Sequence, residues 1–482
     1  MPIASPTPAA PSRTLPDSAP AANVAPAPGA LAFVALAGIA LLGNGLKAVI
    51  SSSVLVSEAQ FAVFLGIATE HVAELLESII AGMVVALAAC PLLLQRTTAR
   101  SLAITACVVA TVAFATFALV DLARPGPATR ELAAFACFAV GAGALALLAP
   151  TSQALVALLP SRTSLTALWT GAAPAGFLVA PQMIKYLLPV LGLGYYFLAF
   201  STLPLVLLAL LAVLGFALPA VRAAGTNASA LPAPMLLAFV ATVIGFEVWT
   251  TFGSVAGYAK PATWAALTAF AAMGGWLARE LRRYPFPPSL TGPSGGLLLA
   301  LFVIEIPTTG FFDTAFLAQR QFSQAFIADR STLAAAAQIL GTLAAGMLVH
   351  RRPGAQSSLL LGFATIAVAG LAAIALYPWI AHPLYYLWTP AVEGFGAAGL
   401  TLLVCLAVVR AAALHPLLAV LPSIAIMLGT EFGLELLQLV YAVARTAGMG
   451  ADDAYGAIFV AQVGFALAAL ALIGAAIRRE VK

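Results

Sequence analysis

Fourteen apolar stretches, each long enough to cross a bilayer, fill this chain almost from end to end. They lie at 30–50, 70–94, 101–121, 132–158, 163–188, 194–220, 233–257, 261–278, 296–318, 331–350, 356–378, 384–409, 413–441 and 454–477. A helix of about 20 apolar residues crosses about 30 Å of hydrocarbon. Because these stretches lack the polar face of a soluble helix, they predict an all-α integral membrane protein with 14 transmembrane helices.

The composition excludes several classes of function. Charged residues make up 8% of the chain and hydrophobic residues 62%, whereas soluble domains are about 25% charged. The connections between stretches are too short for a soluble catalytic domain, and no basic run indicates a nucleic-acid partner. No nucleotide-binding loop indicates an ATP-driven pump, and the four histidines are scattered. We therefore expect no enzyme, no cofactor and no metal site.

The distribution of basic residues predicts the orientation. Residues 1–29 are rich in Pro, Ala and Ser, so we expect a disordered tail there. With that tail inside, the inner segments carry 14 Lys or Arg residues and the outer loops carry six, among them Arg330. Basic residues in short loops are retained on the cytoplasmic side. Both termini are therefore expected on the cytoplasmic side of the cell's inner membrane.

The chain also looks like a duplication. The fourth span of each six-span unit carries a close glycine pair, Gly141-Ala-Gly143 in the first and Gly394-Phe-Gly396 in the second. Glycine at such spacing lets helices approach closely in lipid, and paired halves with a substrate site between them are typical of transporters. We expect an N-terminal half at 30–220, two inserted helices at 233–278 and a C-terminal half at 296–477.

Span five carries the most specific motif, Gly171-Ala-Ala-Pro174-Ala-Gly176, and an aromatic run, Gly194-Tyr-Tyr-Phe197, opens span six. Together with the span layout, these residues resemble the major facilitator superfamily, and within it the fourteen-span drug:proton antiporter branch. The Gly171–Gly176 run is similar to that family's antiporter motif. The resemblance implies a gating role for Gly171, Pro174 and Gly176, which would seal the outer side when the protein faces inward.

The loop after span two keeps only part of the family's pattern. Arg96 and Arg100 match its basic positions, so the resemblance assigns them to the same gating machinery. Gln95 stands where the family has an aspartate, and Cys137 stands where its fourth span usually has an arginine tied to proton coupling. The resemblance implies a monomer whose partners are the bilayer, a small-molecule substrate and protons.

Charged residues inside the spans are the main candidates for coupling, since such groups are costly in hydrocarbon unless they face a cavity or a partner. Spacings of four and three place Glu70, Glu74 and Glu77 on one face of span two. Because clustered carboxylates repel, at least one is expected to hold a proton. Glu77 and Asp313 are expected to face each other across the two halves. The candidate proton-coupling residues are Glu77, Asp313, Glu431, Glu435, Glu393 and Glu305.

Other residues in the spans are candidates for binding the substrate. Lys47 and Lys185 either neutralise nearby carboxylates or bind an anionic group of the substrate. Pro307 breaks span nine between two of its acids, and such breaks line binding cavities in transporters. Aromatic side chains near these positions suit flat organic molecules. The candidate substrate-binding residues are Lys47, Asn44, Glu74, Lys185, Trp249, Phe311 and Phe312.

These patterns favour a secondary active transporter, and first a proton-coupled exporter of a small organic or amphipathic compound. Export is favoured by the antiporter-like motif of span five and by acids in the outer halves of their spans. The alternative is a proton-coupled uptake permease for an anionic metabolite or metal chelate, favoured by Lys47 and Lys185. A membrane-embedded enzyme or scaffold is the hypothesis from a different class.

Overall fold

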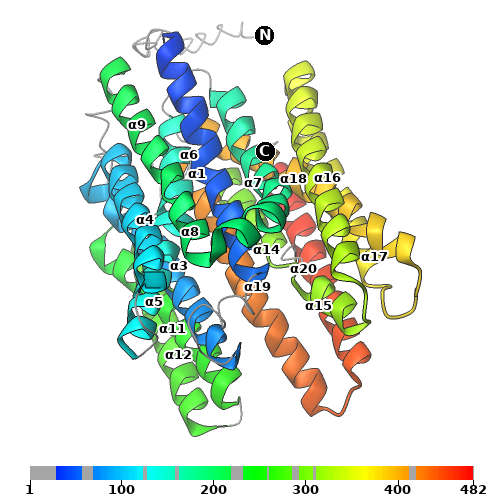
Figure 1. Cartoon of the computed structure of the whole chain (residues 1–482). Helices are drawn as coiled ribbons and strands as arrows, with labels where there is room; N and C mark the ends of the chain where they lie inside the picture. Colours follow the sequence, from blue (N-terminus) through cyan, green and yellow to red (C-terminus); the bar gives the residue numbers. More distant parts are fainter. Residues whose placement is uncertain are drawn as a thin grey trace, which may run out of the picture.

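The computed structural model describes residues 29–56, 69–122, 127–157, 162–218, 232–257, 260–284, 292–307, 311–411 and 419–480. The secondary-structure elements within these ranges are helices, most of them steeply inclined in one common direction (Figure 1). Apart from Gly29, the expected disordered tail lies outside the described residues.

The helices before residue 220 form an N-terminal bundle with one continuous apolar core. They are α1 (Ala30–Val56), α3 (Thr69–Arg96), α4 (Ala99–Leu122), α5 (Pro127–Val140), the π-helix η1 (Gly141–Leu147), α6 (Leu148–Ala157), α7 (Arg162–Tyr186), α8 (Leu188–Phe200) and α9 (Thr202–Ala217). The helix η1 keeps helical dihedral angles at both ends, so α5, η1 and α6 run on as one rod.

The helices after residue 290 form a C-terminal bundle with its own core. They are α14 (Pro293–Glu305), α15 (Phe311–Gln319), α16 (Gln324–Arg351), the 3-10 helix η3 (Pro353–Ala355), α17 (Gln356–Ile374), α18 (Pro383–Ala411), α19 (Leu421–Thr446) and α20 (Ala451–Glu480). Between these two sets in the sequence come α11 (Ala233–Ala256) and α12 (Pro261–Arg283), which pack side by side, with α11 also packed against α3 (Figure 1).

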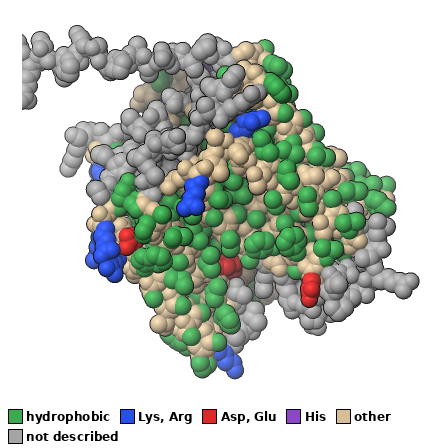
Figure 2. Space-filling view, turned by 90° about the vertical axis from the view of Figure 1, so that its left-hand side faces the viewer, with side chains coloured by type: hydrophobic (Ala, Val, Ile, Leu, Met, Phe, Trp, Pro, Cys, Tyr) green, Lys and Arg blue, Asp and Glu red, His purple; other side chains and the backbone are tan. Residues whose placement is uncertain are grey.

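The surface and the helix lengths identify a membrane protein. Eleven helical segments of the described chain are long and apolar enough to cross a bilayer. Figure 2 shows a face dominated by hydrophobic side chains with few charged ones, and Val112, Phe135 and Phe216 are more than half exposed. Such a continuous apolar exterior fits lipid as its solvent. Each of the fourteen predicted stretches contains a described helix, but α7, α12 and α14 are not among the eleven, so the fourteen-span arrangement stays a prediction.

The predicted repeat pairs α3 with α16, and each of these two helices packs closely on another helix of its own bundle. The helix α3 packs on α5 and η1, and α16 packs on α18. In each case a glycine permits the approach, because a Cβ at Gly82 would collide with the backbone of Phe138 and a Cβ at Gly341 with that of Phe395. Backbone contact of this kind suits helix association in lipid, where small residues form the interfaces. The boundaries of the repeat remain predictions.

The start of α16 corrects one expectation. The hydroxyl of Ser323 caps this helix by accepting a hydrogen bond from the Phe326 backbone amide at 3.2 Å. The helix therefore begins about two turns before the apolar stretch at 331–350, because capping rather than hydropathy determines where a helix starts. Arg330, expected in an outer loop, instead lies within α16 and is 3% exposed.

Candidate functional site

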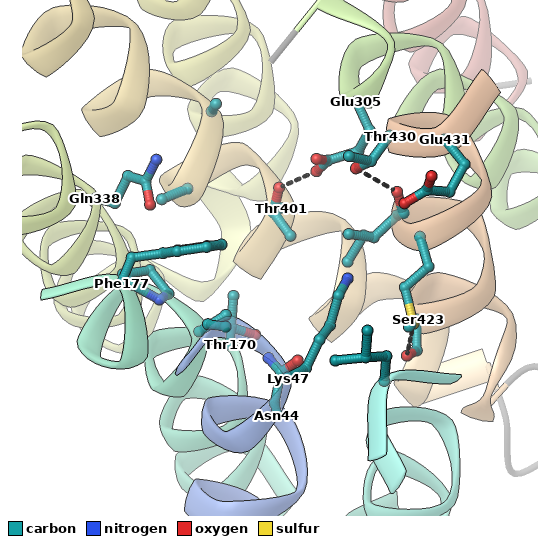
Figure 3. A pocket seen from close by; sticks show the side chains of 18 of the residues that line it. Asn44, Lys47, Thr170, Phe177, Glu305, Gln338, Thr401, Ser423, Thr430 and Glu431 are labelled. Carbon is teal, nitrogen blue, oxygen red and sulfur yellow. Dashed lines mark hydrogen bonds between the residues drawn. The ribbon is translucent and has the colours of Figure 1, made fainter. Parts of the chain in front are cut away.

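A cavity of about 360 Å³ lies between the two bundles (Figure 3). The helices α1, α3, η1 and α7 contribute its wall on one side, and α14, α16, α18 and α19 contribute the other. Its polar and charged lining residues are Asn44, Lys47, Thr170, Glu305, Gln338, Glu393, Thr401, Ser423, Thr430 and Glu431. The remaining lining is almost entirely apolar, with Trp169 and Phe177 as its aromatic members.

Asn44 joins three helices at the edge of the cavity. Its Nδ2 donates a hydrogen bond to the Trp169 carbonyl oxygen of α7 at 2.8 Å. The Trp169 indole in turn donates to the Ser152 hydroxyl of α6 at 2.9 Å. The close approach depends on Gly176, where a Cβ would lie 2.5 Å from the Gly45 carbonyl oxygen of α1. The Gly171–Gly176 motif thus allows α7 to pack directly against α1.

Among the residues that the structure describes, four charged side chains line the cavity, one cation and three carboxyls. Lys47 projects from α1 toward the wall that carries Glu305 and Glu431 (Figure 3). Its strongest electrostatic partner is Glu431 of α19, followed by Glu305 of α14. The Thr401 hydroxyl donates to Glu305 Oε1 at 3.2 Å. Attraction between Lys47 and these carboxyls therefore acts across the boundary between the two bundles.

Glu393 is the third carboxyl and differs from the other two. Its side chain is 8% exposed, and its Oε1 has no hydrogen-bond partner among the described residues. The charged groups that act on it are Glu305 and Arg330. A Cβ at Gly370 of α17 would collide with the Glu393 backbone, so α18 lies tightly against α17 at this point. Buried polar atoms normally have hydrogen-bond partners, so this oxygen is an acceptor that has no donor among the described residues.

The structure places Asn44, Lys47, Glu305, Glu393, Glu431 and Pro174, all predicted from the sequence, around this one cavity. Glu435 is one turn beyond Glu431 and acts on it electrostatically, but it is not part of the lining. Trp249 stacks on Phe270 at 6.0 Å within α11 and α12, away from the lining residues. Phe312 is buried in the C-terminal core.

Asp313 does not face the other bundle as expected. It is 5% exposed and forms an ion pair with Arg330 of α16. Arg330 also donates to the Tyr386 carbonyl oxygen at 3.2 Å and to the Tyr377 hydroxyl at 3.5 Å. This network ties α15 to α16 and α18 inside the C-terminal bundle. The hydropathy pattern did not predict this network, because it placed Arg330 in an outer loop.

Several predicted residues receive no side-chain description. Glu74 and Glu77 belong to α3, Lys185 to α7 and Phe311 to α15, but their side chains lie outside the described part of the structure. Arg96 is exposed at the end of α3.

Arg100 and Gly171 belong to the predicted gating set and contact different helices. Arg100 Nε donates to the Leu211 carbonyl oxygen of α9 at 3.0 Å, which anchors α4 within its own bundle. A Cβ at Gly171 would lie 3.7 Å from the Thr342 methyl group of α16, so this end of the motif faces the opposite bundle.

Gln153 is a residue that sequence reasoning missed. It is 1% exposed in α6; its Oε1 accepts from the Ser423 backbone amide of α19 at 3.0 Å and its Nε2 lies 3.9 Å from Cys405 Sγ of α18. Gln153 therefore joins the two bundles at the point where α6 meets the start of α19. The sequence signal for Gln153 was an uncharged amide inside a span, because a buried amide needs hydrogen-bond partners.

Neither protein-family profiles nor curated proteins match this sequence. Solved structures do match over most of the chain. The human organic anion transporter MFSD10 (TETRAN) matches with a TM-score of 0.62 and 17% identity, over 92% of this chain and 98% of that one. A bacterial homologue of the iron transporter ferroportin, in an outward-facing state, matches with a TM-score of 0.61 and 14% identity, over 94% and 100% of the two chains.

The proton:xylose symporter XylE of the major facilitator superfamily, bound to 6-bromo-6-deoxy-D-glucose, matches with a TM-score of 0.55 and 18% identity, over 91% and 94% of the two chains. The matched proteins are transporters and not enzymes. At these identities the likeness concerns the fold, and the chain has the fold of the major facilitator superfamily transporters.

Proposed function

We propose that this protein is a proton-coupled secondary transporter that exports a small amphipathic organic compound. The observation that carries the proposal is the cavity between the bundles, where Lys47 and three carboxyls come from helices of both sides. Transporters of this fold bind their cargo between two halves and open it alternately to each side. A central cavity with charges from both halves suits that cycle.

The three cavity carboxyls are the proposed proton-coupling set. Three carboxylates around one ammonium in a poorly solvated cavity repel one another, which favours proton uptake by at least one of them. Glu431 is the first candidate because its field acts on Lys47 across the bundle boundary. Ionised Glu431 attracts Lys47 and holds the bundles together, whereas protonation removes that attraction. Glu305, Glu393 and the neighbouring Glu435 complete the set.

Asp313 becomes a weaker candidate for proton coupling because Arg330 already balances its charge. Glu77 stays in the proposal on its sequence spacing alone. The proposal also keeps 14 spans in a six-two-six order, a monomer, and both termini on the cytoplasmic side of the inner membrane. Export as the direction rests on the antiporter-like Gly171–Gly176 motif, which lies between α1 and α16.

Import of an anionic metabolite or metal chelate is the second candidate. Lys47 favours it, because an ammonium group in the cavity offers a site for an anion. The organic anion and iron transporters among the structural matches are compatible with it. The charge balance of the cavity weighs against it, since Glu431 and Glu305 already attract Lys47.

The test uses inside-out membrane vesicles with an acidified interior and a panel of amphipathic compounds. An exporter should accumulate its cargo inside and release protons, which a pH-sensitive dye in the vesicle interior reports. Glu431→Gln should abolish this coupled proton movement, whereas Asp453→Asn, an exposed acid at the start of α20, should not. If no compound moves protons, the transport proposal fails. Concentrative uptake into right-side-out vesicles, with protons moving the same way, would establish import instead.

A further inference from the structure

The orphaned carboxyl oxygen of Glu393 indicates which charge the cargo carries. Glu393 is nine-tenths buried, lines the cavity and has no hydrogen-bond partner for its Oε1 in the described structure. A buried carboxylate without a donor is unfavourable, and a bound cationic group removes that cost by donating to it. The wall therefore contains an acceptor whose donor is not part of the described chain.

Two described basic residues, Arg330, which acts on Glu393, and Lys47, which lines the same cavity, are attracted by other carboxyls. Arg330 acts on Glu393 electrostatically but forms its ion pair with Asp313. Lys47 is attracted most strongly by Glu431, and then by Glu305. Neither side chain forms a hydrogen bond with Oε1 of Glu393 in the described structure. An anionic cargo would add a further negative charge to a cavity whose described lining holds three carboxyls and one ammonium.

The rest of the lining describes the body of the cargo. Ile79, Ile80 and Met83 of α3 and Phe177 of α7 supply apolar wall on the N-terminal side. The volume of about 360 Å³ falls within the range of about 300–1,000 Å³ that small-molecule sites occupy. A molecule that suits this site has a compact apolar body and one positively charged end.

Resting on the proposed transport function, we propose that the cavity binds an organic cation, an ammonium group on an apolar body, and that Glu393 is the residue that binds the ammonium. The ammonium donates to the unpaired Oε1, while the body lies against the α3 and α7 side chains. Glu305 of α14, whose charge also acts on Glu393, adds negative potential to the same end of the cavity.

The test measures binding to the purified full-length protein at pH 7 by calorimetry, with no pH gradient. Three probes share one skeleton and differ in charge: 4-phenylbutylamine, 4-phenylbutanol and 4-phenylbutyrate. We expect the amine to bind tightest and the carboxylate weakest. Since a charged hydrogen bond contributes about 1.5–3 kcal/mol, Glu393→Gln should weaken binding of the amine about ten- to a hundredfold and change that of the alcohol little.

Two further variants separate charge recognition from loss of structure. Glu393→Asp keeps the carboxylate and should retain the preference for the amine, and Asp453→Asn removes an exposed acid and should bind all three probes as the unaltered protein does. Tighter binding of the carboxylate probe, equal loss of all three probes in Glu393→Gln, or no binding of any probe would overturn the proposal. Amine binding that depends on Glu393, without proton-driven movement in vesicles, would instead refute the transport function alone.

Discussion

Replacing Arg330 by methionine should destabilise the protein far more than replacing the neighbouring Arg320. Arg330 is 3% exposed and is held by Asp313, by the Tyr386 carbonyl oxygen and by the Tyr377 hydroxyl. Methionine fills much of the same volume but makes none of these bonds. Asp313, itself 5% exposed, is then left in the core without its cation.

The magnitude follows from burial. Breaking a buried ion pair by removing one partner costs about 3–5 kcal/mol, because the remaining charge stays desolvated. The Arg320–Asp452 pair is the matched control, at 2.7 Å but with side chains 30% and 47% exposed. An exposed pair of this kind contributes about 0–1 kcal/mol. Arg320→Met should therefore retain nearly the full stability of the unaltered protein.

Thermal unfolding of the purified protein in detergent, followed as loss of the monodisperse peak in size-exclusion chromatography, measures the difference. Arg330→Met should unfold several degrees below Arg320→Met. Adding Asp313→Asn to Arg330→Met should recover part of the loss, because it removes the uncompensated charge. Equal midpoints for Arg330→Met and Arg320→Met, or a double variant less stable than Arg330→Met, would refute this account of the network.

Three further outcomes are expected. Gln153→Ala removes the contacts that bridge α6 to α18 and α19, so it should weaken the contact between the bundles by about 1–3 kcal/mol and increase the labelling of a single cysteine placed in the cavity. Gly176→Ala forces a Cβ into the α1 backbone and should lower the free energy of unfolding by about 1–3 kcal/mol. Gly171→Ala should be tolerated, because its added Cβ has its nearest neighbour at 3.7 Å. Thermal unfolding compares the two variants. Single cysteines at Gly354 and Met449 should react with an impermeant reagent from the cytoplasmic and outer sides respectively, and labelling of both from one side would refute the topology.

Much of the fold could be predicted from the sequence because the bilayer restricts the options. A span needs a certain apolar length, and its backbone polar groups must be satisfied within the helix. Each predicted apolar stretch therefore contains a helix in the described structure. Hydropathy failed at the start of α16, where two turns that end in Asp329 and Arg330 belong to the helix and place Arg330 in the core.

The candidate site was predictable in part for the same reason. A charge within a span is costly, so the sequence alone singles out Lys47, Glu305, Glu393 and Glu431, and these four residues line one cavity. The same rule selects Asp313 equally, because the rule considers only the free-energy cost of a charge within a span. It contains no information on which groups pair with that charge.

Partners were decided by the tertiary structure alone. Asp313 and Glu393 are both buried acids in the C-terminal bundle, yet one has an arginine and the other has an unpaired oxygen. Gln153 meets Ser423 from 270 positions away along the chain. The apolar length of each helix is a local property, and the residues of that helix alone are enough to predict it. Which charge is neutralised, and which faces the cavity, depends on how separate helices pack, because electrostatic and hydrogen-bond energies depend on distances between side chains remote in sequence.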